Sequence, residues 1–226
     1  MRWLCASQTG SEPPPALTSI LTLVLATRNK GKVREFQRLF AELLPGKPLE
    51  VTIGSDIGLG DVDETGPTFL ENARIKATAA AAECGRVCLG EDSGLEVDFL
   101  GGAPGVKSHR YSESGLDQDN NLLLLENLKG VPPPARGARY RCAICIAASD
   151  GIIAEGEGVV EGRIGEEFLG ENGFGYDPLF YSTELGKTLG EASAVEKDSV
   201  SHRRRAMEKV AQRLRESACV TEEGFP

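Results

Sequence analysis

Four short segments combine charged, polar and glycine residues at spacings that could carry chemistry. The first is the turn 27–32, where hydroxyl, amide, glycine and lysine groups lie at the expected start of a helix. Because a helix N-terminus offers free backbone N–H groups and a partial positive charge, this turn is suited to an anion such as phosphate. It differs from a P-loop, since Ala26 and Val33 stand where that motif has glycine and a hydroxyl residue. Taken alone, the turn is explained equally well by ordinary helix capping.

The second set of candidate residues is acidic. Asp61, Asp63 and Glu64 lie in a loop just before an expected helix. Glu91 and Asp92 follow a short apolar strand, and carboxylates at strand ends of α/β proteins point into the ligand crevice. Two or three oxygen ligands together with phosphate are the usual surroundings of Mg²⁺. A solvated loop is the simpler interpretation for Asp61 and Asp63, whereas the position of Asp92 favours function.

The remaining two segments could surround a base. In the segment 172–178, two glycines flank Phe174 and a carboxylate follows, so a ring could stack on a base while polar groups read its edge. Lys197 and the basic run 202–205 lie near the start of the last expected helix, where the helix dipole disfavours cations and a partner is expected. A solvated face is the ordinary interpretation of such a run. Together, the four segments have the composition of a nucleotide site.

Alternating strands and helices must position these segments. Apolar runs predict strands at 20–26, 49–53, 87–90, 138–148 and 151–160, and helical spacing predicts helices at 29–44, 67–84, 117–129 and 199–217. Ser149-Asp150-Gly151 is a hairpin signal, so the sheet is not all parallel. Pro67 and Gly85 are expected to begin and end the second helix. The pattern predicts an α/β fold with a mixed sheet flanked by helices.

Composition excludes several classes of protein. The 226 residues carry 25 Lys and Arg against 34 Asp and Glu, a net charge of −9, which argues against a protein that binds nucleic acid through its phosphates. No apolar run reaches the ~18–20 residues that span a bilayer, and the longest, 16–26, lacks a signal-peptide cleavage site. We therefore expect a cytoplasmic protein that binds neither nucleic acid nor membrane. We expect residues 1–19 to form a disordered leader, 20–216 a single catalytic domain and 217–226 a polar tail.

The six cysteines have a structural interpretation and a metal-binding one. Cys84 and Cys88, and likewise Cys142 and Cys145, have the spacing of zinc half-sites. However, residues three apart on a strand point to opposite faces, so the second pair is poorly arranged to hold one ion. Buried structural thiols are therefore the expected role. A non-catalytic protein that binds nucleotide or zinc remains an alternative.

Five segments, taken in order, resemble the inosine/xanthosine triphosphate pyrophosphatase (Ham1-like) family, and its bacterial branch in particular. They are LATRNKGKVREF at 25–36, ETGPTFLENARIKA at 64–77, EDSGLEVDFLGGAPGVKSHRYS at 91–112, GENGFGYDPLF at 170–180 and EKDSVSHRRRA at 196–206. The resemblance implies an elongated α/β fold with a long mixed sheet and two lobes around a central nucleotide cleft. It also implies a homodimer that hydrolyses the small-molecule substrates ITP, dITP and XTP with Mg²⁺, releasing the monophosphate and pyrophosphate and removing deaminated purines from the nucleotide pool.

The resemblance also assigns roles to individual residues. It implies that Asp92 is catalytic and that Glu64 and Asp92 bind the metal. The implied substrate-binding residues are Thr27, Arg28, Asn29, Lys30, Gly31, Lys32, Lys76, Ser93, Phe174, Gly175, Tyr176, Asp177, Lys197, His202 and Arg203. Cationic donors such as Lys197 and Arg203 would donate hydrogen bonds to the 6-keto oxygen of hypoxanthine. Adenine has an amino donor at that position, so these residues would disfavour adenine.

Another house-cleaning pyrophosphatase is an alternative within the same class of enzyme. An enzyme of the Maf type would act on other modified nucleotides. The Ser-x-Ser-x-Arg-Arg turn of that type is absent after the first expected strand, where the sequence reads ATRNKGK. A panel of nucleotides distinguishes the two activities.

Overall fold

The computed structural model describes residues 21–27, 30–44, 49–60 and 62–216. The strands are β1 (Leu21–Leu25), β2 (Leu49–Ile53), β3 (Cys88–Val97), β4 (Gly137–Ala148), β5 (Gly151–Ile164), β6 (Phe180–Ser182) and β7 (Lys187–Thr188). The α-helices are α1 (Lys30–Leu43), α2 (Phe69–Cys84), α3 (Asp117–Asn127), α4 (Ala194–Ser199) and α5 (His202–Glu216). Four 3₁₀ turns join them, namely η1 (Gly54–Ile57), η2 (Asp98–Leu100), η3 (Gly105–Arg110) and η4 (Pro133–Ala135). The expected leader and tail lie outside the described residues.

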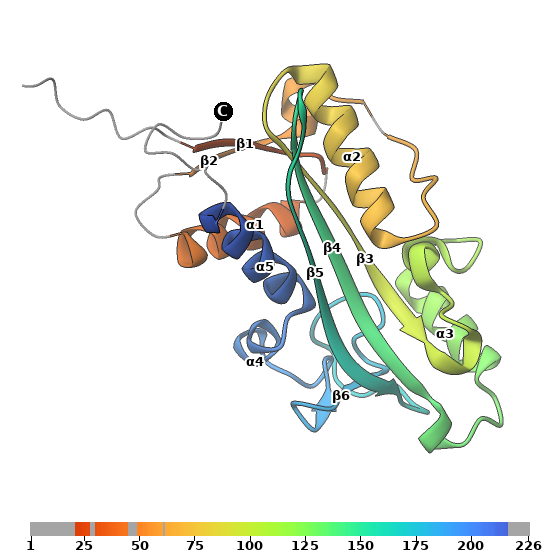
Figure 1. The fold of residues 1–226 in the computed structure, drawn as a ribbon. Helices are drawn as coiled ribbons and strands as arrows, with labels where there is room; N and C mark the ends of the chain where they lie inside the picture. The colour runs from red at the N-terminus through yellow and green to blue at the C-terminus, as the bar shows by residue number, and fades with distance from the viewer. Residues whose placement is uncertain (1–20, 28–29, 45–48, 61, 217–226) are drawn as a thin grey trace, which may run out of the picture.

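A seven-stranded mixed sheet organises the molecule, in the order β2-β1-β3-β4-β5-β6-β7. β2, β1 and β3 are parallel, and the pairs from β3 to β7 are antiparallel. In Figure 1, β3, β4 and β5 run the length of the molecule, and β1 and β2 lie at one end of it. The predicted mixed α/β sheet is confirmed, and so is the hairpin, since Ala148 pairs with Gly151.

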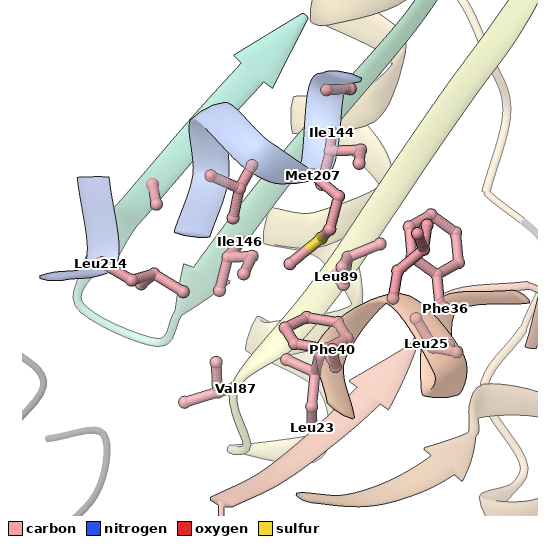
Figure 2. Packing of buried hydrophobic residues seen from close by; sticks show 14 of the residues in the cluster. Leu23, Leu25, Phe36, Phe40, Val87, Leu89, Ile144, Ile146, Met207 and Leu214 are labelled. Carbon is pink, nitrogen blue, oxygen red and sulfur yellow. The ribbon is translucent and has the colours of Figure 1, made fainter. Parts of the chain in front are cut away.

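Two layers of helices cover the sheet at the end that contains β1. α1 and α5 pack on one face, where apolar side chains at helical spacing meet the strands (Figure 2). The side chains labelled there are Leu23, Leu25, Phe36, Phe40, Val87, Leu89, Ile144, Ile146, Met207 and Leu214. The alanine-rich α2 covers the opposite face with Phe69, Ala73, Ala77, Ala80 and Ala81. Burying each large apolar side chain contributes about 1.5–3 kcal/mol.

A second core fills the other end of the long strands. Leu124 of α3 and Leu128, which directly follows that helix, lie in it with Tyr140 of β4 and Phe180 of β6, all buried. The molecule therefore has two lobes, and β3, β4 and β5 pass through both of them. Among the described residues, no helix combines the length and the hydrophobicity needed to cross a bilayer.

The third strand is longer than predicted. The polar residues after Gly90 suggested that the strand ends there, but β3 continues to Val97 and pairs with β4 along its whole length. Glu91 and Asp92 are each 7% exposed. Polar residues remain in this strand because buried cations and amides satisfy them, which the apolar pattern does not indicate.

Two helix starts also differ from the prediction. Thr68 caps α2 by accepting a hydrogen bond from the Glu71 backbone N–H, so Pro67 precedes the helix instead of forming its first turn. The predicted helix from 199 begins only at His202, after the separate helix α4, which Ser193 caps. The prediction that Gly85 ends α2 is confirmed, with φ of 65° in the left-handed region.

Strand glycines let the helices approach the sheet closely. A β-carbon at Gly90 would lie 2.7 Å from the backbone nitrogen of Ala77, and one at Gly158 would lie 2.5 Å from the backbone nitrogen of Ala206. Such separations are too short for non-bonded atoms, so only glycine permits these contacts. The glycines thereby bring α2 and α5 against the strands that carry the polar residues.

We predict that Gly90→Ala destabilises the protein, because the added methyl group must push α2 away from β3. The expected loss in free energy of unfolding is about 1–3 kcal/mol. Gly60→Ala is the matched control, since a β-carbon there meets nothing within 4 Å, and its effect should stay within about 0.5 kcal/mol. Urea unfolding followed by circular dichroism measures both; equal stabilities would contradict the close contact.

Candidate active site

A cavity of about 900 Å³ lies beside the middle of β3. That volume falls within the range of small-molecule sites. Most of the predicted site residues line it, namely Thr27, Lys32, Glu64, Lys76, Ser93, Phe174, Gly175, Tyr176, Asp177, Lys197, His202 and Arg203. Segments far apart in the sequence are therefore brought to one place, as the nucleotide-site hypothesis requires.

An open edge of β3 creates this site. β1 pairs with β3 only through Val24 and Leu25, so beyond Leu89 no described strand runs along that edge as far as Gly94. Side chains on a strand alternate between its faces. Glu91 therefore contacts α1 and α5, whereas Asp92 contacts α2. The acidic side chains at the open edge of β3 therefore contact both layers of helices.

Glu91 is the centre of a buried ion-pair network. Its carboxylate lies 2.6 Å from Lys32 Nζ and 3.2 Å from Arg203 Nε. Arg203 also contacts Glu35 of α1 at 2.7 Å. Burial alone would raise the pKa of Glu91, but Lys32 and Arg203 outweigh burial and hold that pKa well below its usual range. Glu91 is therefore a fixed anion that orients two cations at the cavity.

Asp92 has the opposite electrostatic environment. Its Oδ2 accepts a hydrogen bond from Asn72 Nδ2 at 2.9 Å, and its Oδ1 accepts one from the Ser93 backbone N–H at 3.0 Å. Burial raises the pKa of Asp92, against the opposing effects of Lys76 and Asn72. Asp92 is not itself among the residues that line the cavity, but its neighbours Glu91 and Ser93 and its contact Lys76 are. A carboxyl group with a raised pKa is a better proton acceptor than an ordinary aspartate.

Glu64 and Asp92 share one cation. Lys76 Nζ lies 2.6 Å from Glu64 Oε1 and 3.7 Å from Asp92 Oδ1, and it donates to the Glu91 carbonyl at 3.1 Å. The two carboxylates thus already face a positive group. Mg²⁺ is usually bound by one or two carboxylates, with water and substrate phosphate completing its shell, so this pair of oxygen donors suits Mg²⁺.

The loop after β5 presents an aromatic ring. Phe174 is 63% exposed, and Lys197 Nζ lies 4.5 Å from the centre of its ring. Asp177 is buried, pairs with Lys197, and accepts hydrogen bonds from the Phe174 backbone N–H at 2.8 Å and from Tyr140 Oη at 3.3 Å. An exposed ring beside a cation and a fixed carboxylate is suited to stacking on a base and reading its edge.

His202 lines the same side of the cavity as Lys197 and Asp177. Its ring stacks on Tyr140 with 5.1 Å between centroids and 12° between planes. Burial lowers the pKa of His202 well below its usual range, and the neighbouring Arg203 lowers it further. The imidazole is therefore neutral at pH 7, with one nitrogen able to donate and the other to accept a hydrogen bond.

Parts of the predicted phosphate turn lie outside the described residues. Arg28 and Asn29 lie outside the described residues, as does Asp61. Lys30 and Gly31 begin the described helix α1, but nothing is described beyond their backbone. Asp63 is exposed, consistent with the solvated loop expected for it.

Asn72 and Tyr140 of this site were not singled out from the sequence, and Glu91 was singled out only as a carboxylate at a strand end. Asn72 is fully buried, donates to Asp92 and accepts from the Gly66 backbone N–H at 2.8 Å. Asn72 could have been found from its spacing, because a polar residue four positions before Lys76 lies on the same face of the helix as Lys76. The pairing of Glu91 with Lys32 and Arg203 and the contact of Tyr140 with Asp177 could not be predicted, since these partners come from distant segments.

The four cysteines in the described part of the chain occupy buried or half-buried positions. Cys142 lies in the core beneath α1 and α5, whereas Cys145 lies in the core beneath α2, as alternation on a strand requires. Cys84 and Cys88 have their sulfur atoms 3.4 Å apart. Burial raises the pKa of Cys145 to about 12, which disfavours the thiolate that a metal needs. Within the described part of the chain, no three His, Cys, Asp or Glu side chains gather around a metal position.

We predict that His202 makes stability depend on pH. The pKa of His202 is lower in the folded state than in the unfolded state, so lowering the pH through the unfolded value protonates the unfolded chain first and destabilises the fold. From pH 7.5 to 5.5, the wild type should lose about 1 kcal/mol more free energy of unfolding than His202→Gln. The exposed His109, the other histidine of the chain, provides the control His109→Gln. Parallel curves for wild type and His202→Gln would contradict the prediction.

Known proteins share both the sequence and the fold. Residues 23–213 match the Ham1 family. Proteins named dITP/XTP pyrophosphatase from Desulforamulus reducens and Listeria innocua are 49% and 42% identical to this chain, over 86% of it and 96% and 95% of their own lengths. The structure of the Staphylococcus aureus Ham1 protein matches 86% of this chain and 98% of its own, with a TM-score of 0.78 and 38% identity. The resemblance of the five segments is thereby confirmed, and the chain belongs to the Ham1 family.

Proposed function

We propose that this chain is a nucleoside triphosphate pyrophosphatase that hydrolyses ITP, dITP and XTP to the monophosphate and pyrophosphate. The observation that carries the proposal is one cavity in which two lysines, each paired with a carboxylate, adjoin an exposed ring with a cation over it. The first feature suits a triphosphate and the second a purine base. The activity named for the relatives from D. reducens and L. innocua supports it.

We assign the proton transfer to Asp92. Hydrolysis joins a water oxygen to the α-phosphorus, breaks the bond from that phosphorus to the bridging oxygen of pyrophosphate, and releases one proton. Asp92, with its raised pKa, would take the proton from the attacking water. Glu91 is unsuited to this role, because its two cations stabilise its charged form. Asn72 would keep the Asp92 carboxylate in one orientation.

Charge on the phosphates needs cationic partners. Lys32 and Lys76 line the cavity and would stabilise the negative charge that develops on the departing pyrophosphate. We propose that Glu64 and Asp92 hold Mg²⁺, as their oxygen donors and shared cation suggest. When bound, Mg²⁺ neutralises phosphate charge and polarises the phosphorus–oxygen bonds.

Lys197 is the donor that we assign to the 6-keto oxygen of the base. Adenine presents an amino donor at that position, and two facing donors leave both unpaired. The sequence offered Arg203 as a second donor. Its Nε, Nη1 and Nη2 atoms instead have Glu91, Glu35 and Ser93 as acceptors, at 3.2, 2.7 and 3.4 Å. Arg203 therefore holds Glu91, Glu35 and Ser93 in position, while Lys197 lies beside the exposed ring.

We further propose that the enzyme is a cytoplasmic homodimer. The Ham1-like resemblance supports the dimer. The house-cleaning role implied by the family supports a cytoplasmic location, because that is where the nucleotide pool is used. Light scattering on the purified protein measures its mass directly; a monomer at micromolar concentration would exclude the dimer.

We predict that hydrolysis is selective and depends on metal. Initial rates of pyrophosphate release should be far higher with ITP, dITP or XTP than with ATP or GTP, and removal of Mg²⁺ by chelation should abolish them. Modified pyrimidine nucleotides in the same panel test the Maf-type alternative. Equal rates on all purines would reject the selectivity, and full rates after chelation would reject the metal dependence.

We predict that Asp92→Asn lowers kcat about 10²–10⁴-fold, because the amide can neither accept the proton from water nor supply an anionic ligand to Mg²⁺. Nucleotide affinity, measured by calorimetry, should change only a few-fold. Asp63→Asn is the matched control, since Asp63 is an exposed acid in the neighbouring loop, and its kcat should equal that of the wild type. Unchanged turnover in Asp92→Asn would remove Asp92 from this role.

A further inference from the structure

Side chains of α3 hold both polar backbone groups of Gly175. The Gly175 N–H donates to Asp117 Oδ2 at 2.7 Å, and the Gly175 carbonyl accepts from Asn121 Nδ2 at 2.8 Å. Asp117 and Asn121 lie in the first five residues of α3, more than 50 positions away in the sequence. Two long-range hydrogen bonds to a single loop residue form a clamp, and nothing in the proposed chemistry accounts for them.

The clamp is itself held rigidly. Asn121 is 2% exposed, and its Nδ2 also donates to the Asp117 carbonyl at 2.7 Å. The next loop residue, Tyr176, donates through its hydroxyl to the Ser108 carbonyl of η3 at 2.8 Å. The loop is thus attached to α3 and η3 at two consecutive residues, through the exposed Asp117 carboxylate, the buried Asn121 amide and a backbone carbonyl.

Phe174 depends on this attachment. Its ring is 63% exposed and has Lys197 on one face, so packing against a core does not fix its position. Gly175 follows it with φ of 61°, in the left-handed region that favours glycine. The direction of the ring therefore depends on the backbone around it, which Asp177 holds at the Phe174 N–H and the two α3 side chains hold at Gly175.

Asn121 is less favourable for stability than an apolar residue at the same position would be. Its Oδ1 is buried and, among the described residues, has no hydrogen-bond partner. A buried acceptor without a partner is destabilising, so each such group calls for an explanation. The Nδ2 group supplies one, because only a donor at this position can hold the Gly175 carbonyl.

We propose that Asp117 and Asn121 are positioning residues that orient the base-binding loop and thereby determine purine selectivity. The proposal rests on the function proposed above, and in particular on the loop 174–177 as the base site. Both residues act through Gly175 and not on the reacting phosphates. Their effect should therefore depend on the base and be weak for any step at the triphosphate.

Two nearly isosteric substitutions separate this role from general support of the fold. Asn121→Asp replaces the donor by an acceptor that faces the Gly175 carbonyl, whereas Asp117→Asn keeps an acceptor for the Gly175 N–H. Asn121→Asp should lower kcat/KM for ITP about tenfold, chiefly through KM, while kcat/KM for GTP falls by less than about threefold. Asp117→Asn should remain within about twofold of the wild type, whereas Asp117→Ala should match Asn121→Asp.

Gln118→Ala is the matched control, because Gln118 is exposed in the same helical turn. It should keep wild-type constants for both nucleotides. Asp117 is exposed as well, so Asp117→Ala provides the same test if Asn121→Asp fails to fold.

Two results would overturn the clamp. Wild-type kcat/KM for ITP in Asn121→Asp and Asp117→Ala is one, and an equal fall in kcat/KM for ITP and GTP, as expected of mere structural damage, is the other. The wild-type arm tests the proposed function separately. A wild type without preference for ITP rejects that function, and with it the selectivity role, before any variant is measured.

Discussion

The site depends above all on one buried carboxylate. Glu91 lies between Lys32 of α1 and Arg203 of α5, and Arg203 returns to α1 through Glu35. A buried charge is strongly destabilising unless it is paired, so these contacts fix the two helices relative to β3. Because β1 ends at Leu25, the cations also face an open strand edge and not a closed sheet. The same ion pairs therefore stabilise the lobe that contains α1 and α5 and present positive charge to a ligand.

Neighbouring acids on one strand are given different roles by their surroundings. Two cations hold the pKa of Glu91 low, whereas burial against α2 raises the pKa of Asp92. Pairs of titratable groups whose pKa values are pushed apart identify acid and base roles. The separation is a consequence of strand alternation, since it sends adjacent side chains to different helices. Gly90 contributes by letting α2 approach closely enough for Asn72 to reach Asp92.

Much of this arrangement could be predicted from the sequence, but not all of it. Helical and strand periodicity and the Ser149–Gly151 hairpin predicted the mixed sheet, because those signals are local. The continuation of β3 through Glu91 and Asp92 could not be predicted, since the polar run is stable only with partners from α1, α2 and α5. Arg203 was predicted at the site, but its three acceptors were not, because they come from residues more than 100 positions away.

A crystal structure with Mg²⁺ and a non-hydrolysable ITP analogue tests the central claim most directly, namely that one cavity binds the two parts of the nucleotide with different groups. We expect the triphosphate to contact Lys32 and Lys76, the metal to be held by Glu64 and Asp92, and the base to lie against Phe174 within reach of Lys197. A base beside Lys76, or a nucleotide outside the cavity, would contradict the account.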